Sequence, residues 1–421
     1  MANPRKVAVL ALEKVFSDKA YSNLTLNSFL KDSDLGRTEK AFASNIFYGV
    51  LDRKITLDYF LNKLLKKPIE KASSFTAAVL RAGLYQIIYM DSVPSFSAVD
   101  ESVKLMKKSK ESRNAGLVNA VLRNAIRNGF ELPKGNSIND LSVKYSCPEW
   151  IIKQFINDYS LEDTIAILED TLNPAPIILK VNTLKISAKE LSDLLEKEGI
   201  AVKKTSEADC IEVSGFDISK SELYKKGYFH AQDLACVSVC KKLSPKPNDT
   251  VLDICAAPGG KTFTLAEIMQ NKGKVLACDL YEHRAGLIEE GAEKLGLDIV
   301  ETKANDATQK SDLGEFDKVL CDVPCSGLGI LRRKPDIKYK EITNFSELEE
   351  IQKKILSNAA TYVKNGGNIL YSTCTLRKNE NEEIVKAFLR DNAEFELEYE
   401  HTFLPHIDKT DGFYCALMRK K

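Results

Sequence analysis

Two cysteines and one aspartate lie beside two apolar segments in the C-terminal half of the chain. Asp322 and Cys325 follow the segment KVLC, and Cys374 closes the segment NILYSTC. A thiolate is well suited to add to C6 of a cytosine, which makes C5 nucleophilic enough to accept a methyl group. A neighbouring acid such as Asp322 could hydrogen-bond to N3 and spread the developing charge. A second thiol could assist product release, and these residues alone do not show which cysteine attacks.

Other uses of the same thiols stay open on this evidence. A redox pair formed by Cys325 and Cys374 would close a disulfide under mild oxidation and would need no cofactor. Either cysteine could also be a core residue, since cysteine is common in protein interiors. A methyltransferase acting on nitrogen would need neither thiol. The combination of both thiols with Asp322 therefore favours methyl transfer to carbon.

A loop of small residues follows the first apolar strand expected in this half, over 253–262. Small side chains let a ligand lie against the backbone, and the following helix offers unpaired N–H groups at its N-terminus. A phosphate-binding loop would need glycine where Cys255 stands, and Pro258 removes one N–H group. We therefore expect a nucleoside-bearing cofactor without a pyrophosphate. Its candidate ligands in this loop are Cys255, Ala256, Ala257, Pro258, Gly259, Gly260 and Lys261.

Acidic residues end three successive strands of the expected sheet, at Asp253, Asp279 and Asp306. In an open parallel sheet, ligands bind beyond the carboxyl ends of the strands. Asp279 is placed to accept hydrogen bonds from ribose hydroxyl groups, and Asp306 could hold an adenine amino group. A single acid in such a position is often only a helix N-cap. Three in succession favour a cofactor site.

A basic segment over 331–340 follows the Cys325 loop and carries five basic residues against one acidic residue. We interpret Arg332, Arg333 and Lys334 as contacts to the RNA backbone around a base that has left its stack. A solvated run of charges is the alternative.

The elements that must position these residues form a doubly wound parallel sheet. Short apolar segments alternate with amphipathic helical segments from residue 250 onward, which is typical of this fold. Upstream, the mixed pattern predicts a helix over 149–171, a strand at 177–181 and a helix near 187–199. These belong to a small α+β subdomain.

The first 130 residues show apolar positions spaced by three and four, which predicts an all-α bundle. This region holds 21 Lys and Arg against 12 Asp and Glu, a net charge of +9, whereas the remainder carries −9. A basic domain of this kind suits a polyanionic partner. We predict a helical RNA-binding domain over 1–135, an α+β connecting and RNA-binding subdomain over 136–240, and a Rossmann-like catalytic domain over 241–421.

The composition excludes several classes of protein. The chain is 44% hydrophobic, and its apolar runs fall short of the ~18 residues that a membrane span needs. Ten scattered cysteines suit a reducing cytoplasm better than a disulfide framework. Neither the cysteines nor the four histidines show zinc-ligand spacing, so no metal is expected.

Several motifs make the chain similar to the NOL1/NOP2/Sun family of RNA (cytosine-C5) methyltransferases. DICAAPGGKT, DVPCSGLG and STCTL resemble its cofactor, Pro-Cys and Thr-Cys motifs. KVNTLK, GYFHAQDLACVSV and FLPHIDKTDGFYCALMRK resemble its flanking elements. YQIIYMDSVP and LVNAVLRN resemble a NusB-like bundle, as in the bacterial branch that acts on 16S rRNA. The likeness covers nearly the whole chain, although Lys409 stands where the family often has glycine.

The resemblance implies S-adenosyl-L-methionine as cofactor and Cys374 as the nucleophile, with Cys325 aiding product release and Asp322 assisting. It extends the cofactor site from the 255–261 loop to Asp279, Arg284, Asp306 and Asp322. It also implies 16S rRNA or a small-subunit assembly intermediate as partner, and a cytoplasmic monomer.

Two further functions compete with this interpretation. A non-catalytic NusB-like assembly factor would not need the intact set of Asp322, Cys325 and Cys374. A DNA cytosine methyltransferase would not need an RNA-binding bundle.

Overall fold

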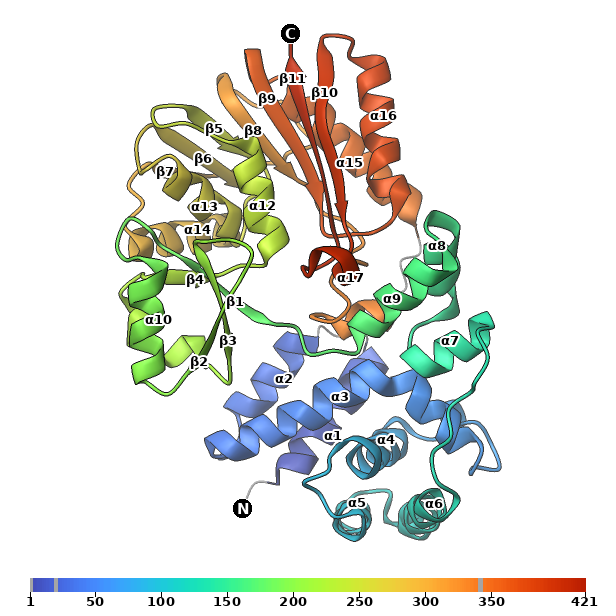
Figure 1. Cartoon of the computed structure of the whole chain (residues 1–421). Coiled ribbons are helices and arrows are strands. Elements are labelled where there is room, and N and C mark those ends of the chain that lie inside the picture. Colours follow the sequence, from blue (N-terminus) through green and yellow to red (C-terminus); the bar gives the residue numbers. More distant parts are fainter. Residues whose placement is uncertain (1–2, 19–21, 340–343) are drawn as a thin grey trace. The chain divides into compact units, whose positions relative to one another are not determined.

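The computed structural model describes residues 3–18, 22–339 and 344–421 (Figure 1). The chain divides into two compact units, residues 1–173 with 331–341, and residues 174–330 with 342–421. The predicted boundaries at 135 and 240 stay predictions, since helices beyond 135 lie in the first unit and two sheets share the second. No helix in the described part of the chain is long and apolar enough to cross a membrane.

The first unit is helical, as the spacing of apolar residues predicts. Its helices bury apolar faces against a common core, in which Phe47, Leu57 and Leu80 are among the buried side chains. A buried ion pair joins two of the helices, because Arg81 Nε lies 2.7 Å from Asp58 Oδ1. The helices are α1 (Pro4–Asp18), α2 (Ser22–Lys31), α3 (Arg37–Asn62), α4 (Ser74–Tyr89), α5 (Ser95–Lys107), α6 (Ala115–Asn128), α7 (Ile138–Tyr145), α8 (Glu149–Asp158) and α9 (Leu161–Thr171).

The single helix predicted over 149–171 is wrong, because the chain forms α8 and α9 with a break between them. Tyr159 is extended, with φ −134° and ψ 178°. The side chain of Ser160 then accepts a hydrogen bond from the N–H of Asp163 and begins α9. A serine followed three residues later by an acid is a strong N-cap signal, and it outweighs the continuous apolar spacing here.

The second unit begins with a small antiparallel sheet in the order β2-β3-β1-β4. The predicted strand at 177–181 is confirmed as β1. The strands are β1 (Ile177–Val181), β2 (Ala201–Lys204), β3 (Cys210–Ser214) and β4 (Phe229–Ala231), with helices α10 (Ala188–Lys197) and α11 (Glu222–Lys225).

A seven-stranded sheet forms the rest of this unit, in the order β10-β11-β9-β8-β5-β6-β7. Strands β5 to β9 pair in parallel, and β10 and β11 pair antiparallel at one side. The expected fold class is thereby confirmed. The strands are β5 (Thr250–Asp253), β6 (Lys274–Asp279), β7 (Val300–Ala304), β8 (Phe316–Asp322), β9 (Val363–Thr373), β10 (Phe395–Phe403) and β11 (Phe413–Lys420). The helices are α12 (Leu234–Leu243), α13 (Gly260–Ile268), α14 (Glu282–Leu295), α15 (Phe345–Ala360), α16 (Glu382–Asp391) and α17 (Pro405–Asp408).

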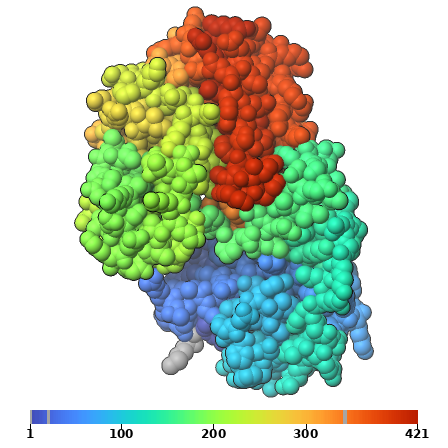
Figure 2. All heavy atoms as spheres, viewed as in Figure 1, coloured from blue at the N-terminus to red at the C-terminus, as the bar shows by residue number. Residues whose placement is uncertain are grey.

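The antiparallel end of this sheet lies partly at the surface. Figure 2 shows the C-terminal strands, in red, beside the yellow-green helix α12 of the same unit. There Lys242 Nζ lies 3.8 Å from the centre of the Tyr399 ring. After α17, Lys409 adopts φ +61°, a left-handed conformation that favours glycine.

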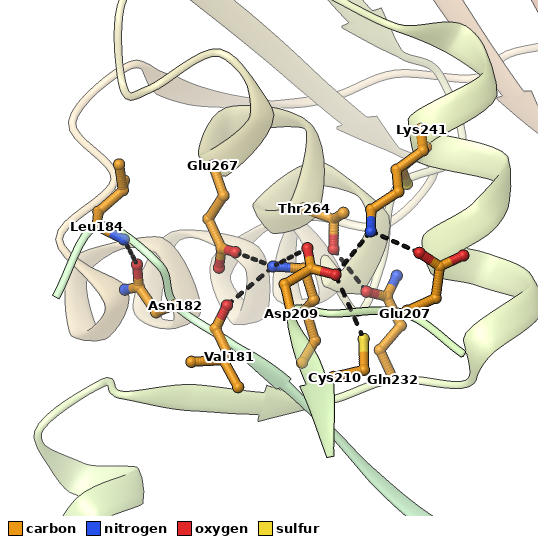
Figure 3. A network of polar contacts seen from close by, with 12 residues as sticks. Val181, Asn182, Leu184, Glu207, Asp209, Cys210, Gln232, Lys241, Thr264 and Glu267 are labelled. Carbon is orange, nitrogen blue, oxygen red and sulfur yellow. Dashed lines mark hydrogen bonds and ion pairs between the residues drawn. The ribbon is translucent and has the colours of Figure 1, made fainter. Parts of the chain in front are cut away.

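A buried polar cluster joins the small sheet to helix α13 (Figure 3). Lys180 of β1 is almost fully buried and forms an ion pair with Glu267 of α13. The ammonium group also lies 3.3 Å from Asp209 Oδ2 and donates to the carbonyl oxygen of Val181 at 2.9 Å. The cluster thereby anchors the small sheet to the helix that begins with the predicted cofactor loop.

Candidate active site

The paired ends of β8 and β9 bring the two cysteine loops together. Asp322, at the end of β8, pairs with Ser372 near the end of β9. The two chains then continue into the loops that carry Cys325 and Cys374, whose sulfur atoms lie 3.2 Å apart. Both cysteines are partly exposed, and neither forms a disulfide. The strand register therefore places two thiols and the carboxylate at one edge of the sheet, as the sequence predicts.

The carboxylate of Asp322 is held from two sides. Lys261 Nζ donates to Oδ2 at 2.8 Å, and the hydroxyl group of Ser372 donates to Oδ1 at 2.8 Å. Burial is the largest single influence and lowers the pKa of Lys261, but the charge and hydrogen bond of Asp322, together with the nearby Cys236 and Cys240, outweigh it and hold this pKa well above its usual value. The site therefore keeps a fixed cation beside the acid.

The close contact between the two sulfur atoms affects the pKa of Cys325. The hydrogen bond with Cys374, followed by burial, raises the pKa of Cys325 well above its usual value. Cys325 therefore keeps its proton near neutral pH, and a protonated thiol can donate to the neighbouring sulfur.

The predicted cofactor loop has the shape expected of a backbone cradle. Gly259 adopts φ +107°, and a Cβ atom there would lie 2.4 Å from the Phe263 ring. Asp279 is almost fully buried and accepts from the N–H of Ala257 at 3.2 Å. The Arg284 side chain contacts both Asp279 and Ala257. Its Nη1 lies 3.2 Å from Asp279 Oδ1, and its Nη2 donates to the carbonyl oxygen of Ala257 at 3.0 Å. These contacts fix the loop against the end of β6.

The donor set at this edge fits a nucleoside. An ionised carboxylate can accept about four hydrogen bonds, so Asp279 retains capacity for hydroxyl groups. Asn305, whose N–H donates to the carbonyl oxygen of Asp279 at 2.8 Å, carries a buried amide nitrogen with no hydrogen-bond partner among the described residues. A buried donor without a partner is costly, and a ligand would supply the missing acceptor. Asn305 is not among the site residues predicted from the sequence, although it directly precedes Asp306.

The other two acids at strand ends have local partners. Asp306 is exposed, and its Oδ1 accepts from the N–H and the hydroxyl group of Thr308 at 2.9 and 2.7 Å. Asp253 is buried and accepts from the hydroxyl group of Thr262 at 2.7 Å. Burial raises the pKa of Asp253 to about 7. Asp253 therefore supports the start of α13, and a contact between Asp306 and adenine stays a prediction.

The predicted RNA-contacting residues belong to the first unit, whereas the two cysteine loops belong to the second. The Arg332 side chain is only 7% exposed, and its Nη1 lies 3.1 Å from Asp170 Oδ2. Arg333 is half-buried and Lys334 is exposed. A structural ion pair thus accounts for Arg332, while RNA contacts by this segment stay a prediction.

Family models match three successive parts of the chain. The NusB family matches residues 2–127, and the ferredoxin-like domain of RsmF/B-like methyltransferases matches 147–216. The model of the 16S rRNA methyltransferase RsmB/F matches 240–419. The matched segments follow the order of the helical bundle, the small sheet and the large sheet.

Individual relatives match most or all of the chain. The chain is 38% identical to the probable ribosomal RNA small subunit methyltransferase B of Bacillus subtilis (strain 168), with 99% of this chain and 98% of the relative covered. The crystal structure of PH0851 has a TM-score of 0.83 at 25% identity and covers 100% of this chain and 99% of its own. The crystal structure of NSun6 from Pyrococcus horikoshii with SFG covers 65% of this chain and 98% of its own. Its TM-score of 0.60 at 23% identity shows a common fold.

Proposed function

Because this chain belongs to the ribosomal RNA small subunit methyltransferase B family, we propose that it methylates C5 of a cytosine in 16S rRNA through a covalent adduct between Cys374 and the base. The observation that carries this proposal is the pair of reduced cysteines, with sulfur atoms 3.2 Å apart, beside Asp322. Methyl transfer to nitrogen or oxygen would leave both thiols without a chemical role.

The proposed cofactor is S-adenosylmethionine, which when bound supplies an electrophilic methyl group. Its nucleoside portion would lie along the 255–261 loop, with Asp279 accepting from the ribose hydroxyl groups and Arg284 fixing that carboxylate. The unsatisfied amide nitrogen of Asn305 and the carboxylate of Asp306 would take the adenine. The conformation of the loop supports this assignment, because Gly259, at φ +107°, turns the backbone into the N-terminus of α13.

Cys374 is the proposed nucleophile. Its thiolate would form a bond to C6, and the electron pair displaced from the C5–C6 bond would become available at C5. This assignment rests on the likeness of STCTL to the family's Thr-Cys motif, since either sulfur of the close pair could donate to the other. Asp322 would hydrogen-bond to N3, held in place by Lys261 and Ser372.

Product release requires two further bonds to break. The proton at C5 must leave, its electron pair must reform the C5–C6 double bond, and the bond from C6 to Cys374 must break. A water molecule would accept the C5 proton, and Cys325 would assist by donating to the departing sulfur of Cys374, which lies 3.2 Å away. The proposed substrate is 16S rRNA or a small-subunit assembly intermediate, in keeping with the names of the matching family and relatives. An unpaired cytosine in it would be reached at least cost.

The test uses ribosomal RNA from cells lacking this protein, incubated with tritiated S-adenosylmethionine and wild-type, Cys374→Ala or Cys325→Ala protein. We expect labelled 5-methylcytosine with the wild type. We also expect an RNA adduct that survives a denaturing gel with Cys325→Ala but not with Cys374→Ala. The opposite adduct pattern would reverse the two cysteine roles. An absence of methylation on both free RNA and assembled subunits would refute the proposal.

A further inference from the structure

A buried carboxylate holds both neighbours of Cys325. Glu380 is fully buried, and its Oε2 accepts from the backbone N–H of Ser326 at 2.8 Å and from Gln352 Nε2 at 3.0 Å. Gln352 Nε2 also donates to the carbonyl oxygen of Pro324 at 3.0 Å. The residues on either side of Cys325 are thus tied, directly or through one amide, to Glu380.

The next residue in the chain holds both neighbours of Cys374 in the same manner. The hydroxyl group of Thr373 donates to Asn381 Oδ1 at 2.6 Å. Asn381 Nδ2 donates to the carbonyl oxygen of Thr375 at 3.0 Å. Asn381 is fully buried. Two consecutive side chains therefore each form hydrogen bonds that hold a different cysteine loop.

The segment that carries both side chains is itself anchored from several directions. Arg377 Nη1 donates to Glu380 Oε1 at 3.0 Å, and its Nη2 donates to Glu349 Oε1 at 3.2 Å. The hydroxyl group of Tyr371 donates to the carbonyl oxygen of Glu380 at 2.7 Å. A buried carboxylate is retained only where such partners compensate its lost hydration. Glu380 is therefore a rigid point of attachment.

We propose that Glu380 and Asn381 are positioning residues for the two thiols, Glu380 fixing the Cys325 loop and Asn381 fixing the Cys374 loop. This inference rests on the proposed cysteine adduct mechanism. It assigns adduct formation and adduct breakdown to two adjacent positioning side chains. Cys374 forms the bond to C6, so Asn381 acts on adduct formation. Cys325 assists the breaking of that bond, so Glu380 acts on adduct breakdown.

The substitution Glu380→Gln changes only one acceptor. A carboxamide has a single oxygen, so its NH₂ group must face either the donors at Ser326 and Gln352 or the donor at Arg377. Asn381→Asp keeps the acceptor for Thr373 but places an oxygen against the carbonyl of Thr375. Both variants preserve size. Glu349→Gln is the matched control, because it weakens the outer contact of Arg377 without touching either cysteine loop.

The experiment follows formation and decay of the RNA adduct in single-turnover reactions with quenched denaturing gels. We expect Glu380→Gln to form the adduct at close to the wild-type rate but to resolve it at least about tenfold more slowly, since small displacements of a reacting group have large kinetic effects. Asn381→Asp should slow adduct formation to a similar degree and leave its decay unchanged. Glu349→Gln should match the wild type in both steps.

Equal slowing of both steps in both variants would overturn the inference, because it would indicate only general structural support. A wild-type rate for both variants, or an effect of Glu349→Gln equal to that of Glu380→Gln, would overturn it as well. If Glu380→Gln folds poorly by circular dichroism, Gln352→Leu replaces it. That change removes the donor to Pro324 and an amide oxygen that has no hydrogen-bond partner among the described residues.

A second readout separates this inference from the proposed function. Iodoacetamide labelling, followed by mass spectrometry, gives the alkylation rate of each thiol without RNA. Glu380→Gln should change the alkylation rate of Cys325 more than that of Cys374. Asn381→Asp should change the alkylation rate of Cys374 more than that of Cys325. If the wild type forms neither adduct nor methylcytosine, the proposed function fails while this selectivity still supports positioning. Equal changes at both thiols would refute positioning even in an active enzyme.

Discussion

Replacing Lys180 with methionine should destabilise the second unit by about 3–5 kcal/mol, the usual cost of removing one partner from a buried ion pair. Lys180 is 1% exposed, and the side chain of its partner Glu267 is also 1% exposed. The substitution leaves that carboxylate buried without a cation, while Asp209 retains Lys241 at 2.7 Å. Methionine has nearly the same length as lysine, so the loss comes from charge rather than from a cavity.

The penalty should depend on pH through Glu267. Burial raises the pKa of Glu267 from 4.5 to about 7, against the opposing charge of Lys180. Without Lys180 this pKa rises further, so the folded state of the variant binds a proton above pH 7 that the unfolded state does not. Stability then falls with rising pH in that window, by up to about 1.4 kcal/mol per pH unit. The difference between variant and wild type should therefore be larger at pH 8.5 than at pH 6.

The assay is urea unfolding followed by hydrogen-exchange mass spectrometry, in which peptides from β1 and α13 report the second unit. A loss of about 3 kcal/mol should lower the urea midpoint by about 1 M or more. Trp150 is the single tryptophan and lies on α8 in the first unit, so its fluorescence reports that unit separately.

The double variant with Glu267→Gln should regain most of the loss, since no buried charge then lacks a partner. Lys203→Met, in an exposed pair with Glu212 on the same small sheet, is the matched control and should cost less than about 1 kcal/mol. A penalty for Lys180→Met that is equal at both pH values and unrelieved in the double variant would refute the reasoning.

Three further substitutions test the site. Lys261→Met removes the cation beside Asp322 and should slow adduct formation about 100-fold in single-turnover assays with little change in circular dichroism. Asp279→Ala should weaken S-adenosylmethionine binding by at least about tenfold in calorimetry, since hydrogen bonds to a charged group contribute about 1.5–3 kcal/mol. Gly329→Ala should lower stability by about 1–3 kcal/mol or more in thermal unfolding, because its Cβ would lie 1.9 Å from the carbonyl oxygen of Gly412.

Much of the site could be predicted from the order of residues alone. A parallel sheet brings the carboxyl ends of its strands to one edge, so acids and thiols that follow apolar segments must gather there. This reasoning located Asp322, Cys325 and Cys374 together, and the structure places the two sulfur atoms in contact. It succeeded because strand ends are marked locally, by the change from apolar to small or polar residues.

Side chains whose surroundings come from distant segments could not be predicted in this way. The stretch RKNENEE looks like an exposed polar loop, yet Glu380 and Asn381 within it are fully buried. Lys180 sits in a short strand whose buried anion comes from a helix 87 residues away. Arg332, expected to face RNA, forms an ion pair with Asp170. A buried charge is stable only beside a partner, and that partner is chosen by how the chain folds rather than by its neighbours in sequence.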